Sequence, residues 1–225
     1  MPTVLVTGAN RGLGLEFARQ YAGDGWSVVA TVRDLAEADE LRAVPDDVAI
    51  EQLDVRDFDA VARLTDRLGD RPIDVMIANA GTWGPQRIES ASEADDWMET
   101  FAVNSVAPVL LAYALLGHVE AAGGKLIAIT SRMGSIADND SGGYIAYRAS
   151  KAALNAAWKS LAIDSAGQGV VAALLHPGWV QTRMGGASAP LQPAESVAGM
   201  RRVIAGLTAE RSGGFFDHDG TPIPW

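Results

Sequence analysis

Thr7-Gly8-Ala9-Asn10-Arg11-Gly12-Leu13-Gly14 is a glycine-rich turn between a short apolar run, Thr3–Val6, and a helical stretch, Leu15–Tyr21. Its glycines suit a tight turn, a close approach of backbone to a phosphate and close packing of helix on strand. The start of the helix then offers free N–H groups and a favourable dipole to a pyrophosphate. The spacing is Gly-x-x-x-Gly-x-Gly rather than the Gly-x-Gly-x-x-Gly of many dinucleotide sites, so a turn without a ligand is the alternative. We predict a nucleotide site made by Gly8, Asn10, Arg11, Gly12, Leu13 and Gly14.

Five more apolar runs follow, separated by stretches with apolar residues at helical spacing. The runs show little polar alternation, which is typical of strands buried on both faces of a parallel sheet. Strand–helix alternation from end to end predicts an α/β fold with a single doubly wound (Rossmann) parallel sheet and helices on both faces. With no linker or repeat, residues 1–225 are expected to form one domain. The runs are Ser27–Thr31, Val48–Leu53, Val75–Ala78, Leu126–Thr130 and Val170–Leu175.

The composition narrows the classes of function. The 225 residues are 48% hydrophobic and carry a formal net charge of −10, which argues against a broad surface for nucleic acid or an anionic membrane but permits a local basic pocket. The absence of cysteine excludes disulfides and thiolate chemistry. Because neither a leader peptide nor an apolar stretch long enough to span a bilayer is apparent, we expect a cytoplasmic protein.

The end of the second apolar run bears on which dinucleotide binds. NAD sites usually carry an acid there that hydrogen-bonds the ribose, whereas this chain has Val32 followed by Arg33. Arg33, with Arg11 from the glycine turn, could pair with the 2′-phosphate of NADP. Asp34 weakens this inference, since one residue of slack would bring its carboxylate to the ribose, and both arginines could simply be solvated. The balance favours NADP(H) over NAD(H).

Asp54-Val55 ends the third apolar run. A carboxylate at the C-terminal end of a strand could accept a hydrogen bond from an adenine amino group. It could equally cap the helix expected near Asp57, and the residues leave both interpretations open. Asp54 and Val55 are included among the predicted cofactor contacts.

Tyr147 and Lys151 lie four residues apart in the run Tyr-Arg-Ala-Ser-Lys, which places them on one face of a helix. A phenol with a pKa of about 10 is a poor acid–base catalyst, and a nearby cation lowers that pKa towards working pH. Tyr-x-x-x-Lys occurs often by chance, so the pair gains meaning only beside the predicted nucleotide site.

Taken in order, the motifs resemble those of the short-chain dehydrogenase/reductase family over nearly the whole chain. Two stretches look closest to its sniffer/C-factor-like carbonyl reductase branch, namely Gly134-Ser135-Ile136-Ala137-Asp138-Asn139 and the ending from Gly213 to Trp225. The matching motifs are the glycine turn, Asp54, Asn79-Ala80-Gly81, Asn104, Ser131, Tyr147 with Lys151, and Pro177-Gly178 with Thr182.

The resemblance implies a catalytic role for four residues. Ser131 would hydrogen-bond the substrate oxygen, and Tyr147 would donate a proton to it as hydride reaches the carbonyl carbon. Lys151 would lower the phenol pKa and hold the nicotinamide ribose, while Asn104 would hold a water that relays protons between Lys151 and solvent. The alternatives are a turn cap for Ser131, a satisfied polar group in a helix for Asn104, and an exposed surface residue for Lys151.

The resemblance also implies further cofactor contacts. Asn79, Ala80 and Gly81 would let the backbone lie against the adenosine half, although Ala78 stands where the family often has another asparagine. After the sixth run, Pro177-Gly178 forces a turn that would bring Val180 and the Thr182 hydroxyl to the nicotinamide carboxamide. Packing of strand on helix and an ordinary loop are the alternatives.

The substrate pocket is predicted from large side chains near these positions. The segment Arg183–Pro193 is short and rich in Gly, Ala and Pro where the family often has a helical lid, which favours a mobile, open entrance and varied aldehydes or ketones. Arg183 could attract an acidic substrate or be solvated. The pocket candidates are Trp83, Met133, Tyr144, Trp179 and Met184.

The sequence therefore predicts an NADPH-dependent oxidoreductase that reduces aldehydes or ketones to alcohols, reversibly, with Tyr147 as general acid/base. No metal is expected, because His118, His176 and His218 lack ligand spacing. The resemblance implies a homodimer or homotetramer. A catalytically idle NAD(P)-binding regulatory or redox-sensing protein is the alternative; a sugar-nucleotide epimerase would need a further substrate domain.

Overall fold

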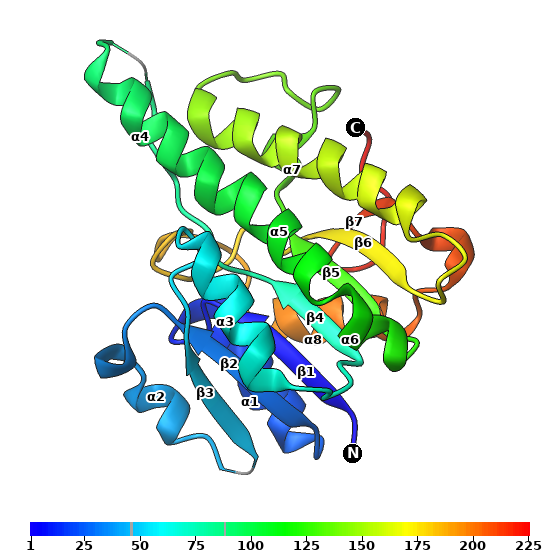
Figure 1. Ribbon diagram of the computed structural model, residues 1–225. Helices are drawn as coiled ribbons and strands as arrows, with labels where there is room; N and C mark the ends of the chain where they lie inside the picture. Colours follow the sequence, from blue (N-terminus) through cyan, green and yellow to red (C-terminus); the bar gives the residue numbers. More distant parts are fainter. Residues whose placement is uncertain (46, 88) are drawn as a thin grey trace.

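The computed structural model describes residues 1–45, 47–87 and 89–225. Strands and helices alternate along the chain (Figure 1). The strands are β1 (Thr3–Thr7), β2 (Ser27–Val32), β3 (Val48–Gln52), β4 (Val75–Ala78), β5 (Lys125–Ile129), β6 (Val171–His176) and β7 (Gly214–Asp217). The longer helices are α1 (Gly12–Gly23), α3 (Phe58–Leu68), α4 (Ser92–Phe101), α5 (Ala107–Ala114), α7 (Ile145–Asp164) and α8 (Pro193–Ala205). The shorter helices are η1 (Leu35–Glu37), α2 (Asp39–Arg42), η2 (Ala102–Val106), α6 (Leu116–Ala121), η3 (Arg132–Gly134) and η4 (Ala209–Arg211).

All seven strands form one parallel sheet in the order β3-β2-β1-β4-β5-β6-β7. The order reverses between β1 and β4, and in such folds ligands bind in the crevice outside the carboxyl ends of the strands at this switch point. The predicted doubly wound α/β fold is confirmed.

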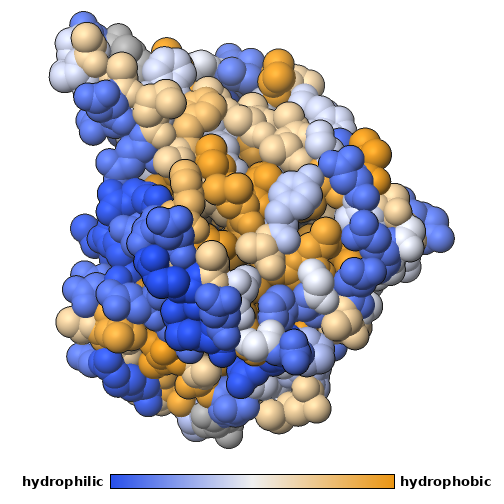
Figure 2. All heavy atoms as spheres, in the orientation of Figure 1, coloured by the Kyte–Doolittle hydropathy of each residue, from blue (hydrophilic) through white to orange (hydrophobic). Residues whose placement is uncertain are grey.

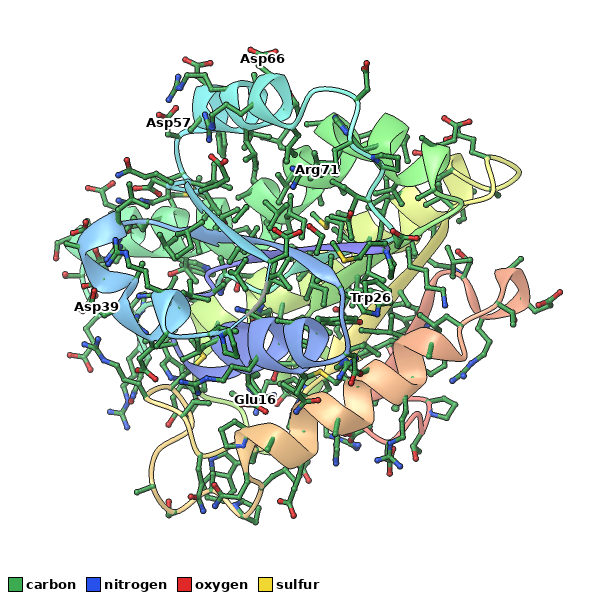
Figure 3. The ribbon with its side chains drawn as sticks, turned by 90° about the horizontal axis from the view of Figure 1, so that it is seen from below. Glu16, Trp26, Asp39, Asp57, Asp66 and Arg71 are labelled. Atoms are coloured by element: carbon green, nitrogen blue, oxygen red, sulfur yellow. The ribbon has the colours of Figure 1, made fainter. Side chains whose placement is uncertain are left out.

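Alternation along the strands supplies two hydrophobic cores, one on each face of the sheet. On β1, Val4 and Val6 pack on the face that α1 and α8 cover, whereas Leu5 packs on the opposite face under α3, α5 and α7. Figure 3 shows α3, marked by Asp57 and Asp66, on one side of the sheet and α1, marked by Glu16, with α8 on the other. Both faces are buried, which explains why the strands lack polar alternation.

The six predicted runs correspond to the first six strands, with ends that differ by at most one residue. Strand β7 was missed because its apolar residues are only two adjacent phenylalanines, which give no pattern of their own. Phe215 and Phe216 point to opposite cores, and β7 becomes a strand by pairing with β6.

Among the described residues, no helix combines the length and apolar character needed to cross a membrane. Apolar side chains do gather on one outer face, over α5 and the adjoining part of α7 (Figure 2). The large apolar residues exposed on these two helices and the preceding η2 are Val106, Leu110, Tyr113, Ile145 and Ile163.

Candidate active site

The predicted site residues gather at the carboxyl edge of the sheet, because every strand of a parallel sheet ends there. Asn104, Tyr147 and Lys151 lie in helices, whereas the others follow six different strands. The residues that follow strands are the glycine turn after β1, Arg33 after β2, Asp54 after β3, Asn79–Gly81 after β4, Ser131 after β5 and Pro177–Thr182 after β6.

The glycine turn has the shape of an anion cradle. Gly8 has a φ of 64°, in the left-handed region, and a Cβ on Gly14 would collide with the Gly8 carbonyl oxygen. Arg11, at the N-cap of α1, is extended and supplies no side-chain cap. Within the described residues, no side-chain cap accepts from the first N–H groups of α1, which leaves them available to the predicted phosphate.

At the end of β2, Arg33 is exposed while Asp34 is committed to local structure. The Asp34 carboxylate accepts a hydrogen bond of 2.9 Å from the backbone N–H of Ala36 and so caps η1. No carboxylate within the described ranges forms a salt bridge to Arg11 or Arg33. Because its carboxylate caps η1, Asp34 is less available to hydrogen-bond the ribose of NAD in the way that the acid of an NAD site does.

Asp54 is held by Arg56 rather than by a helix start. The guanidinium donates to the carboxylate at 2.7 Å and 3.1 Å, and this hydrogen bonding keeps the pKa of Asp54 below its usual range despite partial burial. Asp57 caps α3 instead, accepting from the Ala60 N–H at 3.1 Å. The capping interpretation of Asp54 is wrong, while its adenine contact stays a prediction.

An open cleft of about 540 Å³ lies at this end of the site, between β3, α3 and the residues after β2. Arg33, Leu35 and Asp54 are among its lining residues. Nearby, the Asn10 amide of the glycine turn donates to the Glu37 carboxylate at 3.0 Å. The cleft adjoins the predicted adenosine site rather than Tyr147.

Asn79 ties the end of β4 to the glycine turn. Its amide donates to the carbonyl oxygens of Thr7 at 2.9 Å and Gly8 at 3.2 Å. The Thr7 hydroxyl accepts from the N–H groups of Asn79 and Ala80 at 3.0 Å and 3.1 Å. The Asn79 side chain is thus occupied in bonding the backbone of the glycine turn. The backbone of Ala80 and its neighbours remains as the predicted cofactor surface.

Asn104 is fully buried in η2, one turn of π-helix between α4 and α5. Its amide donates to the carbonyl oxygen of Thr82 at 2.8 Å and to the Ser150 hydroxyl at 3.0 Å, and its Oδ1 accepts from the Thr82 N–H at 2.9 Å. Both amide hydrogens are therefore used inside the fold. The satisfied-group interpretation is confirmed; a water relay would have to use Oδ1 or the main chain.

Ser131, Tyr147 and Lys151 come together between β5 and α7. Each is buried, and hydrogen bonding by Ser131 acts to lower the pKa of the Tyr147 phenol. The Lys151 Nζ donates to the Ile129 carbonyl oxygen at 2.9 Å and lies 5.8 Å from the centre of the Tyr147 ring. Gly134 permits this approach, because a Cβ there would lie 2.8 Å from the Cβ of Lys151. The surface interpretation of Lys151 is wrong, while Ser131 also accepts from Met133 N–H and caps η3.

Burial dominates the acid–base behaviour of this group. It raises the pKa of Tyr147 to about 12, against a smaller opposing effect of the Ser131 hydrogen bond. It also lowers the pKa of Lys151 to about 8, because the ammonium loses its hydration. In the chain by itself, Lys151 therefore does not produce the net lowering of the phenol pKa that was expected. Tyr147 is protonated at neutral pH, as a proton donor must be.

The loop after β6 faces the glycine turn. Gly178 has a φ of 81°, and a Cβ on Gly12 would lie 3.6 Å from the Thr182 methyl group. The Thr182 hydroxyl accepts from the Gly185 N–H at 3.1 Å, while Val180 pairs with Leu191. The loop thus holds Thr182 above the predicted cofactor site.

Of the five pocket candidates, Trp83 packs against the phenol and Tyr144 packs against Trp83. The Trp83 ring lies 4.3 Å from the Tyr147 ring and 5.3 Å from the Tyr144 ring, between centroids. Its indole N–H donates to the Met184 carbonyl oxygen at 3.1 Å. Met133 lies two residues from Ser131 in η3. Trp179 instead hydrogen-bonds the Gly185 carbonyl at 2.7 Å and is largely exposed.

The segment 183–193 is irregular up to the start of α8, as expected in place of a helical lid. It is nevertheless tied down, since the Gln181 amide donates to the Ala189 carbonyl at 2.7 Å and Ala189 is buried. Mobility of this entrance stays a prediction. So does the absence of a metal, although in the described part of the chain no three His, Asp or Glu side chains are grouped to hold one.

Sequence reasoning missed the polar residues that support the site. Thr7 and Thr82 serve as described above, and Thr130 donates to Asn155 of α7 at 2.6 Å. Ser150 also donates to the Tyr147 carbonyl oxygen at 2.8 Å. Polarity is the one sequence signal of Thr7, Thr130 and Ser150, and it does not reveal their partners, while Thr82 acts through its backbone and carries no signal.

Comparison with known proteins gives consistent matches. The family model for short chain dehydrogenase matches residues 2–192. The C-signal protein of Myxococcus xanthus is 48% identical over 155 residues, covering 68% of this chain and 93% of the relative. The solved carbonyl reductase Sniffer of D. melanogaster is 35% identical with a TM-score of 0.93, over all of both chains. A carbonyl reductase from Pseudomonas aeruginosa PAO1, solved in complex with NADP, is 36% identical with a TM-score of 0.86, again over all of both chains.

Proposed function

Because the chain belongs to the short-chain dehydrogenase/reductase family and is an oxidoreductase enzyme, we propose that it uses NADPH to reduce aldehydes or ketones to alcohols. The observation that carries this proposal is the buried group of Ser131, Tyr147 and Lys151 at the sheet edge that also holds the glycine turn. Carbonyl reductases among its structural relatives support the reaction class.

The proposed chemistry divides between cofactor and chain. When bound, the nicotinamide supplies the hydride that reaches the carbonyl carbon. The Ser131 hydroxyl holds the substrate oxygen, and the protonated Tyr147 phenol donates a proton to it. The Lys151 ammonium stabilises the phenolate left behind. Burial of the three groups keeps water from competing for these hydrogen bonds.

The preference for NADPH rests on the end of β2. Arg33 is exposed beside an open cleft, and the carboxylates of Asp34 and Asp54 are engaged by Ala36 N–H and Arg56 respectively. A free guanidinium pairs with a phosphate in bidentate fashion. The NADP complex of the Pseudomonas relative supports the same choice. Asn10 would approach the cofactor only after exchanging its bond to Glu37.

Self-association through α5 and α7 belongs to the proposal. Val106, Leu110 and Tyr113 are exposed on one apolar face, and an apolar patch of this kind marks an interaction site more often than bare surface. We therefore propose a homodimer or homotetramer. Sedimentation at micromolar concentration tests this, and a monomer would contradict it.

Turnover with Tyr147→Phe tests the reaction. The wild-type protein is expected to oxidise NADPH in the presence of aldehydes or ketones, followed by the loss of absorbance at the nicotinamide band. The variant is expected to lose at least about 100-fold in kcat and to bind NADPH as before, because only the proton donor is removed. Retained turnover would reject the acid role of Tyr147, and a wild type that binds NADPH but reduces no carbonyl would favour the idle regulatory alternative.

A further inference from the structure

Arg148 lies next to Tyr147 on α7, and the proposed chemistry leaves its side chain unused. The guanidinium Nε donates to the carbonyl oxygens of Gly142 at 3.1 Å and Gly143 at 3.2 Å. One terminal nitrogen donates to the Ser141 hydroxyl at 2.9 Å. No carboxylate in the described part of the chain forms a salt bridge to it. This half-buried arginine therefore donates its hydrogen bonds to uncharged acceptors of one loop.

The loop that Arg148 holds has little packing of its own. Residues 141–145 are exposed, and a Cβ added to Gly142 or Gly143 would meet nothing within 4 Å. The one other side-chain bond to these residues that the structure describes runs from the Gly142 N–H to Asn139 Oδ1 at 3.1 Å. The hydrogen bonds of Arg148 are therefore the main restraint on the loop.

That restraint maintains an unusual backbone. Gly142, Gly143 and Tyr144 have successive φ values of 64°, 67° and 50°. Among the described residues, Tyr144 is the one non-glycine residue with a positive φ, which a residue with a Cβ adopts only when its surroundings enforce it.

The enforced conformation bears on the reaction site. It places the Tyr144 ring against Trp83, which in turn lies against the ring of Tyr147. The other terminal nitrogen of Arg148 reaches the Met133 carbonyl oxygen at 3.4 Å, in the turn that follows Ser131. A single guanidinium therefore links the loop before α7 to η3 across the proposed substrate side.

We propose that Arg148 is a positioning residue that fixes Tyr144 and Trp83 as a wall of the substrate pocket, and thereby sets selectivity for apolar carbonyl compounds long enough to reach that wall. The proposal rests on the function proposed for the Tyr147 site. Small aldehydes that react without touching the wall do not depend on Arg148. Lysine cannot replace it, since an ammonium lacks the planar fork that serves several acceptors at once.

The test uses the full-length protein with NADPH and two aldehydes, octanal and propanal. In Arg148→Met we expect KM for octanal to rise about tenfold, with kcat for octanal, KM for propanal and the Kd of NADPH within about twofold of wild type. Arg148→Lys is expected to behave like the methionine variant and serves if that variant folds poorly. Arg202→Met, at an exposed arginine of α8, is the matched control.

Two further measurements isolate the loop. Hydrogen exchange of residues 139–144 is expected to accelerate about tenfold in Arg148→Met. In a Tyr144→Gly background, which removes both the ring and the backbone strain, Arg148→Met is expected to change KM for octanal less than about twofold. Unchanged exchange, equal losses with both aldehydes, or additive effects in the double variant would each overturn the proposal. A wild type inactive on both aldehydes would reject the proposed function, and exchange would still decide whether Arg148 restrains the loop.

Discussion

Replacing Lys151 with methionine is expected to stabilise the protein at neutral pH while abolishing its activity. Burial lowers the pKa of Lys151 from 10.5 to about 8. Between these pH values the unfolded chain therefore binds more protons than the folded chain. The contribution of Lys151 to folding stability is fully present above pH 10.5 and is lost as pH falls to 8. At about 1.4 kcal/mol per pH unit, the loss amounts to about 3 kcal/mol.

Methionine removes this free-energy cost of the buried amine. It also removes the hydrogen bond from Nζ to the Ile129 carbonyl, which contributes about 1 kcal/mol. Lys151→Met is thus expected to gain about 2 kcal/mol at pH 7 and to lose about 1 kcal/mol near pH 10.5. Activity is expected to fall at least about 100-fold at every pH, since the phenolate loses its cation.

Urea unfolding of both proteins at pH 7 and pH 10, without cofactor, measures the difference. Lys159→Met, at an exposed lysine of the same helix, provides the matched control for the loss of one charge. The reasoning is refuted if the wild type and Lys151→Met show the same change of stability between the two pH values, because the buried ammonium would then carry no such penalty.

Other perturbations address the cofactor site and the acid range. Arg33→Ala is expected to raise the Kd of NADPH at least about tenfold and to leave that of NADH unchanged, since only NADPH carries the 2′-phosphate; equal losses in fluorescence titrations would remove the assignment. Gly14→Ala places a Cβ against the Gly8 carbonyl, so thermal unfolding should show a loss of about 1–3 kcal/mol and both dinucleotides should bind less tightly; normal stability and binding would contradict the close approach. Burial lowers the pKa of His176 to about 4, so the stability it contributes is present above pH 6.5 and is lost by about 3 kcal/mol as pH falls to 4. In urea unfolding, His176→Gln should therefore lose less stability than the wild type between pH 7 and pH 4.5. Equal losses in the two proteins would contradict this pKa shift of His176.

The fold could be predicted because its decisive constraints are local. Strand runs without polar alternation demand two covered faces, and the glycine turn after Thr3–Val6 demands the start of a helix. Strand β7 could not be predicted in the same way. Gly214–Asp217 has no periodicity of its own, and it pairs with β6 only once the sheet offers an edge.

In the candidate site, too, local features could be predicted and features that depend on distant residues could not. That Tyr147 and Lys151 share a helix face and that Ser131 follows a buried strand could be read from the chain alone, because spacing along one element fixes direction. The folded chain was needed to see that Asp54 pairs with Arg56, that the Asn104 amide donates to Thr82 and Ser150, and that Arg148 restrains the loop before α7. Hydrogen-bond partners and burial depend on residues distant in the chain. The protonation states of the phenol and the amine follow from that burial, and no local pattern encodes them.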